Sequence, residues 1–233
     1  MNWGRVELDW SDRPVLIVGT GPSLHGVDLS RLNGLGYVLA VKEAVWDLPF
    51  ADACFGLDLP WMRRQGDRLE ELARRMPVYL AVPDQHPPVH RYSPSAVYLQ
   101  RVRGDTSLSE DPGTVESGGN SGFGAFNLAY LAHSREIFLF GYDYGGEPYC
   151  PDRYSHHPRG HNARYLPRWA ENFRYAVRQL AAAGVTVINT SSRSSVDAFP
   201  KSDLEQALVY LDRVRQARSA PLGLRGDMLV SAS

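Results

Sequence analysis

Three histidines stand close together in the chain, because His156, His157 and His161 fall within six residues. A histidine titrates near neutral pH, so one of these imidazoles could act as a general base on an attacking hydroxyl group. Together with the nearby Asp143 and Cys150 the cluster could instead bind a transition metal. A solvated polar loop without a specific role is the third interpretation. Because the spacing matches no standard ligand motif, no metal site is predicted.

Arg153 and Arg159 flank the histidines. The planar guanidinium group matches the oxygens of phosphate and carboxylate, so these two side chains are candidates for binding the anionic group of a donor molecule. Tyr142 and Tyr144 precede the cluster. Their phenols could hydrogen-bond a leaving phosphate, or they could pack this loop against the rest of the protein.

A second candidate site is the turn Gly19-Thr20-Gly21-Pro22-Ser23, which follows the apolar run of residues 15–18. The turn lacks the third glycine of a dinucleotide motif and the lysine of a P-loop. Its glycines still let the backbone approach a ligand closely, and the amides of the next helical segment could point at phosphate oxygens. Ser23 could add a hydroxyl donor or cap that segment. A plain tight turn between a strand and a helix is the alternative.

A third candidate spans residues 117–144, where small polar residues precede a helix and a strand ends in Gly141-Tyr142-Asp143. Asn120, Ser121 and Gly122 fall at the expected start of the helix, where amides and side chains can face a ligand. Asp143 falls just beyond the carboxyl end of a parallel strand, where open α/β sheets place their sites. Asn120 or Ser121 could equally be a simple helix cap, and Asp143 could cap a turn.

Alternating strands and helices must position these residues. Runs typical of strands cover residues 14–18, 36–41, 52–57, 78–82, 96–102, 136–140 and 185–189. Helical patterns cover residues 60–76, 120–132, 165–183 and 202–218. The alternation predicts an α/β fold, with a doubly wound, mainly parallel sheet in a single Rossmann-like domain over residues 1–218. The tail, residues 219–233, is predicted to be mobile.

Two long polar stretches, residues 104–119 and 144–164, follow predicted strands. Such stretches are uncommon in compact domains unless they function or are disordered. The second is predicted to be a lid-like insertion that closes over a nucleotide and excludes water. Disordered insertions are the alternative.

Composition sets wider limits. The chain has 233 residues, 43% of them hydrophobic and 22% charged, with a formal net charge of −1, so nucleic acid is not an indicated partner. No signal peptide and no membrane span are predicted, and two cysteines are too few for a disulfide framework. A cytoplasmic location follows as the expectation, and a homo-oligomer is left open.

The order G-x-G-P-S-L, then [TN]-S-G, then EI[YF]L-x-G-x-D resembles a known superfamily. It joins bacterial sialyltransferases of the Campylobacter type (glycosyltransferase family 42-like) to proteins like 6-hydroxymethylpterin pyrophosphokinase (DUF115). The resemblance covers about residues 15–208 and implies a Rossmann-like fold that binds a nucleotide at the carboxyl edge of the sheet. It also implies a bacterial or phage origin.

Carried onto this chain, the resemblance places the nucleotide against Gly19, Thr20, Gly21, Pro22 and Ser23, against Lys42, and against Asn120, Ser121 and Gly122. Thr20 stands where the sialyltransferases have asparagine. A second asparagine of that family falls in the neighbourhood of residues 40–43 here, so that contact is either missing or replaced by Lys42. The family's S-H-x-x-G-H string is similar to residues 155–161, one residue longer here, so His156 and His161 are the candidate general bases.

Three function classes result. The first is a nucleotide-sugar glycosyltransferase with a histidine base, for which Asp143 is a further catalytic candidate. Its donor would be linked to CMP, UDP or GDP, its acceptor would be a small molecule or a glycan, and no resident cofactor is implied. The second is a pyrophosphokinase of the pterin type that uses ATP with magnesium. The third is a non-catalytic nucleotide-binding protein of a phage or bacterium.

Overall fold

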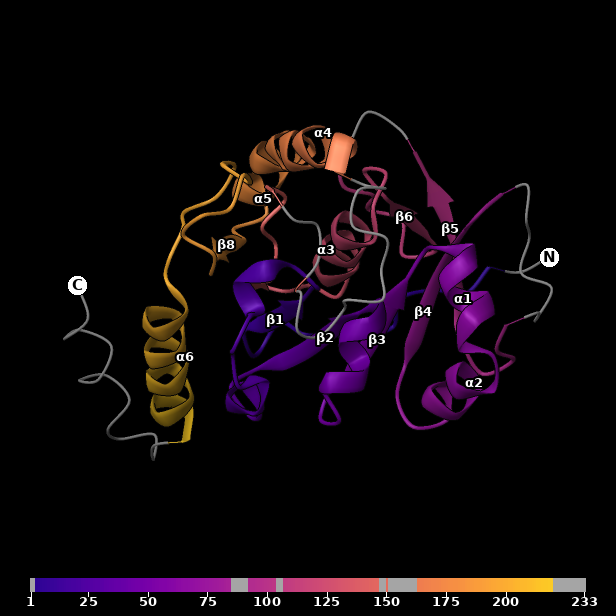
Figure 1. Cartoon of the computed structure of the whole chain (residues 1–233), viewed down its shortest axis with the longest axis horizontal. Coiled ribbons are helices and arrows are strands. Elements are labelled where there is room, and N and C mark those ends of the chain that lie inside the picture. The colour runs from indigo at the N-terminus through magenta and orange to yellow at the C-terminus, as the bar shows by residue number, and fades with distance from the viewer. Residues whose placement is uncertain (1–2, 85–91, 104–106, 147–149, 151–162, 220–233) are drawn as a thin grey trace.

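One parallel sheet organises the molecule. The computed structural model describes residues 3–84, 92–103, 107–146, 150 and 163–219. Eight strands in this part of the chain pair in the order β6-β5-β4-β3-β2-β1-β7-β8, and every pair is parallel (Figure 1). The strands are β1 (Val15–Val18), β2 (Tyr37–Val41), β3 (Ala53–Gly56), β4 (Val78–Pro83), β5 (Val97–Val102), β6 (Thr114–Glu116), β7 (Glu136–Phe140) and β8 (Thr186–Asn189). The predicted doubly wound α/β fold is confirmed.

The direction of winding changes beside β1. The chain runs from β1 through β6 toward one edge of the sheet, and then returns to place β7 and β8 on the other side of β1. This change creates a crevice at the carboxyl ends of β1 and β7 because the connections leave in opposite directions. Open α/β sheets bind ligands in such a crevice, so the strand order alone marks a place for a site.

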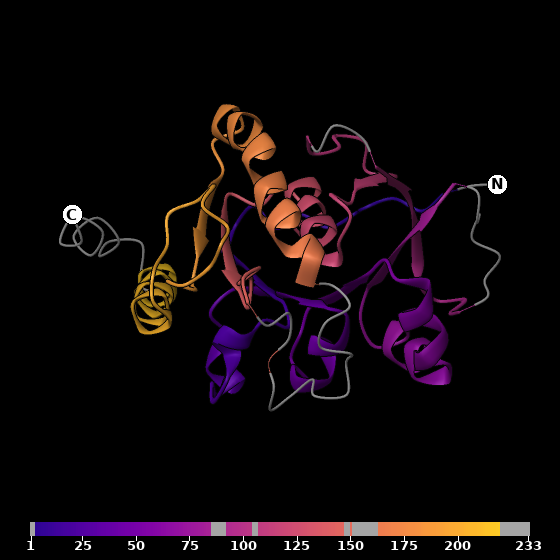
Figure 2. The same cartoon turned by 45° about the horizontal axis from the view of Figure 1, so that its top comes forward.

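Helices cover both faces of the sheet, as Figure 2 shows for the orange α4–α5 segment and the purple α1 and α2. One face carries α3 (Ser121–Leu131), η4 (Ala163–Tyr165), α4 (Leu166–Asn172), η5 (Phe173–Ala176) and α5 (Val177–Ala182). The other carries η1 (Pro22–Leu24), η2 (Leu29–Leu32), η3 (Lys42–Asp47), α1 (Leu59–Gln65), α2 (Asp67–Ala73) and α6 (Leu204–Ser219).

The alternation of side chains along each strand feeds these two cores. In β1, Val15 and Ile17 join the core under α3, whereas Leu16 and Val18 join the opposite core. All four are fully buried, which explains the uninterrupted apolar run in the sequence. The helix α3 is itself buried along most of its length.

Three predicted elements need correction. The stretch 104–119 contains β6, whose buried Val115 lets three residues pair with β5 despite the surrounding glycine and proline. The helix predicted over 60–76 is two helices, because Gly66 has φ +52° and ψ −133°, which is not helical. The helix predicted over 165–183 is divided by the 3₁₀ turn η5. The tail predicted over 219–233 starts one residue too early, since Ser219 still belongs to α6, and residues 220–233 lie outside the described part of the chain.

The two cysteines, Cys54 and Cys150, are free and buried. Burial raises the pKa of the Cys54 thiol well above its usual range. In the part of the chain that is described, no helix has the length and apolar character needed to cross a membrane.

Candidate functional site

A cavity of about 300 Å³ occupies the crevice at the carboxyl ends of the strands. It brings together segments far apart in the sequence: the turn after β1, the end of β2, the start of α3, the end of β7 and the start of α4. The lining residues are Gly19, Thr20, Gly21, Val41, Lys42, Asp58, Gly119, Asn120, Ser121, Gly122, Gly141, Tyr142, Asp143, Tyr144, Leu166 and Trp169. The two motifs singled out in the sequence therefore share one cavity.

The turn after β1 packs against the turn after β7. The Gly19 amide donates to the carbonyl oxygen of Phe140 at 2.8 Å, and the Gly21 amide donates to that of Gly141 at 3.0 Å. A Cβ atom on Gly21 would lie 2.1 Å from Asp143 Oδ2, so only glycine fits at this contact. The glycines of this turn thus permit close contact with the turn after β7, rather than only with a ligand.

The turn leads into a short helical segment, the three-residue 3₁₀ turn η1. Pro22 and Ser23 do not line the cavity. The Ser23 amide and hydroxyl both donate to Asp143 Oδ2, at 3.1 and 2.9 Å, so Ser23 serves an internal carboxylate.

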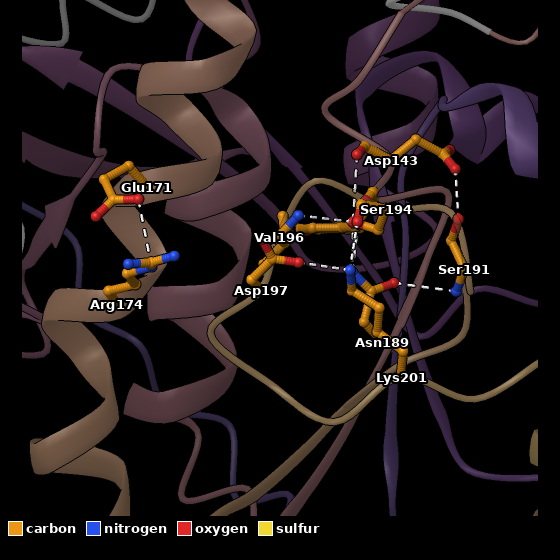
Figure 3. A network of polar contacts seen from close by, with 10 residues as sticks. Asp143, Glu171, Arg174, Asn189, Ser191, Ser194, Val196, Asp197 and Lys201 are labelled. Atoms are coloured by element: carbon orange, nitrogen blue, oxygen red, sulfur yellow. Dashed lines mark hydrogen bonds and ion pairs between the residues drawn. The ribbon is translucent and has the colours of Figure 1, made fainter.

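Asp143 is the centre of a buried hydrogen-bond network, part of which Figure 3 shows. Besides the two bonds from Ser23, its Oδ1 accepts a hydrogen bond from the Ser191 hydroxyl at 2.6 Å. Its carbonyl oxygen accepts one from the Ser195 amide at 2.7 Å. Asn189 and Ser194 extend the network to β8. The carboxylate therefore joins the loops after β1, β7 and β8.

The amino end of α3 opens on the cavity. Asn120 caps this helix, because its Oδ1 accepts the Phe123 amide at 2.9 Å. The same oxygen accepts the hydroxyl of Tyr144 at 2.7 Å. With the oxygen fixed by two donors, the amide nitrogen Nδ2 points elsewhere, and it has no hydrogen-bond partner among the described residues. The hydroxyl of Ser121 has none either.

These two groups are buried hydrogen-bond donors that the described part of the chain leaves without an acceptor. Asn120 and Ser121 are 8% and 7% exposed. Leaving such a group without a partner costs about 1–3 kcal/mol, so native proteins rarely do it without a reason. A bound oxyanion would satisfy both donors and would also meet the positive end of the helix dipole.

Two tyrosines fix the geometry of this helix end. Tyr142 donates its hydroxyl to the carbonyl oxygen of Gly122 at 2.9 Å, beside the bond from Tyr144 to Asn120. Burial raises the pKa of both phenols far above the usual range, so both remain protonated donors at neutral pH. The packing role that the sequence offered for them is thus realised at the cavity wall.

Lys42, which directly follows β2, contributes a positive charge to the lining of the cavity. Its side chain is 13% exposed and forms an ion pair with Asp58 at 2.5 Å. Lys42 has φ +52° and Tyr144 has φ +51°. Left-handed backbone at residues other than glycine carries strain, and such strain clusters at binding and catalytic sites.

Several predicted site residues lie outside the described part of the chain. They are the histidines His156 and His161, the arginines Arg153 and Arg159, and most of the insertion at 144–164. Within the described residues, no group of three histidine, cysteine, aspartate or glutamate side chains could hold a metal ion.

Sequence reasoning did not identify Trp169 and Leu166, which α4 contributes to the cavity. Their positions in a predicted amphipathic helix fit a packing role as well as a binding role. No motif or spacing distinguishes the two roles before the fold places α4 over the strand ends.

Known proteins offer a likeness of fold. No protein-family profile matches the chain, and no curated protein matches it. Two solved structures of the sialyltransferase CstII from Campylobacter jejuni are similar, each at 13% sequence identity. The complex with the substrate analogue cytidine-5'-monophosphate gives a TM-score of 0.48 over 82% of this chain and 85% of that chain. The complex with CMP-3FNeuAc gives 0.45 over 82% and 86%.

Proposed function

We propose that the protein is a transferase that binds an activated nucleotide donor in this cavity and passes part of it to an acceptor hydroxyl group. The amino end of α3 would bind the phosphates. The observation that carries the proposal is the pair of buried donors on Asn120 and Ser121, which have no partner among the described residues and stand at the start of an eleven-residue helix.

The remaining geometry fits an anionic ligand. The amides of Ser121 and Gly122 belong to the first turn of α3, where they have no partner within the helix. Together with Asn120 Nδ2 and Ser121 Oγ they form a set of donors at one end of the cavity. Lys42 adds a positive charge from the end of β2. Phosphate groups bind in such places because amides, dipole and cation act on the same oxygens.

The resemblance in sequence motifs favours a nucleotide sugar as the donor. His156 or His161 would then be the general base that removes the proton of the acceptor hydroxyl, since both follow the Gly-x-Asp strand in the chain. Arg153 and Arg159 would bind the donor's anionic group. The base of the nucleotide would be cytosine, uracil or guanine.

The pyrophosphokinase alternative requires carboxylates that are open to a metal ion. The two carboxylates that line the cavity are already engaged: Asp58 by Lys42, and Asp143 by Ser23 and Ser191. For this reason the nucleotide-sugar transferase is proposed first, and ATP with magnesium is one arm of the test.

The first experiment measures thermal stability with CMP, UDP, GDP and ATP, each with and without magnesium. A nucleotide present at 100 times its Kd stabilises the fold by about 2.7 kcal/mol. For a chain of this size that is a rise in Tm of roughly 5–11 °C. The variant Ser121→Ala should lose most of the rise, whereas Ser30→Ala, on an exposed part of η2, should keep it. No rise with any nucleotide, or an equal rise in Ser121→Ala, would refute the proposal.

The second experiment measures donor hydrolysis and transfer for His156→Ala, His161→Ala and the double variant. Loss of a general base lowers kcat about 100- to 10,000-fold and leaves donor affinity nearly unchanged. A double variant as active as the parent would place the base elsewhere. Turnover of ATP with magnesium, without turnover of nucleotide sugars, would favour the pyrophosphokinase.

A further inference from the structure

Two arginines lie at the carboxyl end of β5, beside the cavity but outside its lining. Arg101 is in the last part of the strand and Arg103 follows it by two residues. Residues two apart on a strand point to the same side of a sheet. Leu99, two residues before Arg101, belongs to the core under α3. Both guanidinium groups are therefore on the side of the sheet that α3 and α4 cover.

Neither arginine forms an ion pair or a hydrogen bond with a carboxylate in the described part of the chain. Arg101 is partly buried, and burial lowers the pKa of its guanidinium, with the positive charge of Arg103 as the second cause. The negative charge of Asp58 raises the pKa of the Arg101 guanidinium and so opposes these two effects. Because Asp58 already pairs with Lys42, the two arginines contribute positive charge that this carboxylate does not balance.

Arg103 and Trp169 converge on one point at the edge of the cavity. A Cβ atom on Gly119 would lie 3.1 Å from the indole Nε1 of Trp169 and 3.2 Å from Nη2 of Arg103. Gly119 has φ +84° and carries no side chain, and a Cβ atom there would make tight contact with both donors, so both donors lie directly against the Gly119 backbone. Both Gly119 and Trp169 line the cavity. Tyr165, the last residue of η4, stacks on Trp169 with ring centroids 5.7 Å apart and supports the indole ring.

We infer that Arg101, Arg103 and Trp169 form a subsite for an oxyanion on the acceptor, so that the acceptor is an acidic molecule carrying a carboxylate or a phosphate. This inference rests on the proposed transferase function. Two guanidinium groups and an indole N–H are donors suited to such a group, because guanidinium binds it through paired hydrogen bonds.

The distance from the turn after β1 assigns this subsite to the acceptor rather than to the nucleotide. Four strand spacings separate β5 from β1. At about 4.8 Å each, they amount to roughly 19 Å. The start of α3 lies between them, since Gly122 packs beside Tyr142 after β7 and Gly119 packs beside Arg103 after β5. A donor bound at the start of α3 would therefore have the Gly19–Gly21 turn on one side and the two arginines on the other.

A binding experiment tests the subsite without any enzyme activity. The probes are glucuronate, glucose 6-phosphate and glucose, and the signal is the indole N–H resonance of Trp169, assigned with Trp169→Phe. We expect the two acidic sugars to shift this resonance and glucose to leave it unchanged. Arg103→Gln should weaken binding about 10- to 100-fold, and Arg101→Gln should act in the same direction. The exposed Arg75→Gln is the matched control and should bind like the parent.

Comparing the three sugars separates the sources of the oxyanion, because a response to one acidic sugar alone would name its group as the carboxylate or the phosphate. A shift of equal size with glucose, or one that persists in both arginine variants, would overturn the inference. Ser121→Ala should not affect this signal. Failure of nucleotide binding would therefore be seen separately from failure of the subsite.

An activity measurement then tests the assignment to the acceptor. In Arg103→Gln, the KM for an acidic acceptor should rise about 10- to 100-fold, whereas the KM for the donor should change little. A raised KM for the donor, with acceptor KM unchanged, would assign the arginines to the donor and contradict the inference.

Discussion

The substitution Asn120→Asp separates ligand binding from folding at the candidate site. Asn120 uses its Oδ1 within the protein and lines the cavity, and its buried Nδ2 has no partner among the described residues. Aspartate has the same shape, so one oxygen can still cap Phe123 and accept the Tyr144 hydroxyl. The change replaces the unpartnered donor with a negatively charged oxygen.

The expected loss of affinity follows from this exchange. A hydrogen bond to a charged phosphate contributes about 1.5–3 kcal/mol. Its loss alone weakens binding roughly 10- to 150-fold. Repulsion between the new carboxylate and the phosphate adds to this, because two like charges 4 Å apart repel by up to about 4 kcal/mol at an effective dielectric constant of 20. We therefore expect the Kd of the nucleotide to rise at least about 100-fold.

Stability should respond differently. Asparagine and aspartate are about equally good helix caps, and a negative charge is favourable near the start of a helix by about 0.3–1 kcal/mol. Against this gain, the new charged oxygen is buried without a partner among the described residues, which costs about 1–3 kcal/mol, so the free energy of unfolding of Asn120→Asp should fall by no more than about 3 kcal/mol and the protein should stay folded.

The assay is calorimetric titration with the nucleotide that the stability panel selects, alongside urea unfolding of each protein. Asn33→Asp, at an exposed position after η2, is the matched control for the added charge. A folded Asn120→Asp protein that binds the nucleotide as tightly as the parent would refute the idea that α3 receives the phosphates.

Three further predictions concern the framework of the site. Asp143→Asn should lower the free energy of unfolding by about 1.5–3 kcal/mol, or the Tm by roughly 3–12 °C, because one charge-assisted hydrogen bond from Ser23 or Ser191 is lost. Unchanged thermal unfolding together with lost turnover would instead give Asp143 a catalytic role. Gly66→Ala should lower the free energy of unfolding, measured in urea, by about 1–3 kcal/mol. The φ of +52° at this position strains any residue with a side chain, although the space around it is open. An unchanged free energy of unfolding would mean that the junction of α1 and α2 adjusts its backbone. Hydrogen bonds from Ser95 and then Ser93 lower the pKa of Glu70 to about 2, so the stability that its carboxylate contributes is complete above pH 4.5 and is lost as the pH falls to 2. The difference in unfolding free energy between the parent and Glu70→Gln should therefore shrink over this interval. A constant difference would contradict the assignment.

The sequence predicted the centre of the sheet well because its strands are fully buried. A short, uninterrupted apolar run such as Val15–Val18 is long enough for a buried strand but too short for a helix, and the same holds for Glu136–Phe140. The strand Thr114–Glu116 escaped prediction because three residues at an edge carry too little pattern. The divisions of the long helices escaped because apolar spacing continues across Gly66 while the backbone does not.

The candidate site was predicted in part, for a comparable reason. Residues that directly follow a buried strand or start a buried helix are placed by the topology, so Gly21 and Asn120 could be assigned to one edge of the sheet. Trp169 and Arg103 reach the same place from α4 and β5 through tertiary packing. No short motif encodes that packing, and a single sequence gives no other means to detect it.

The burial of α3 divides the cavity into a fixed half and an adaptable half. Because α3 is surrounded by core residues along most of its length, its amino end cannot turn or shift without disturbing the packing of Phe123 and Phe126. The helix α4, by contrast, buries Leu166, Ala170 and Asn172 but leaves Pro167 and Arg168 exposed, so these two positions tolerate changes in sequence at little cost to the fold. An engineer who wished to change what the protein accepts would leave α3, the proposed phosphate-binding helix, untouched and would randomise the exposed positions of α4 together with the end of β5.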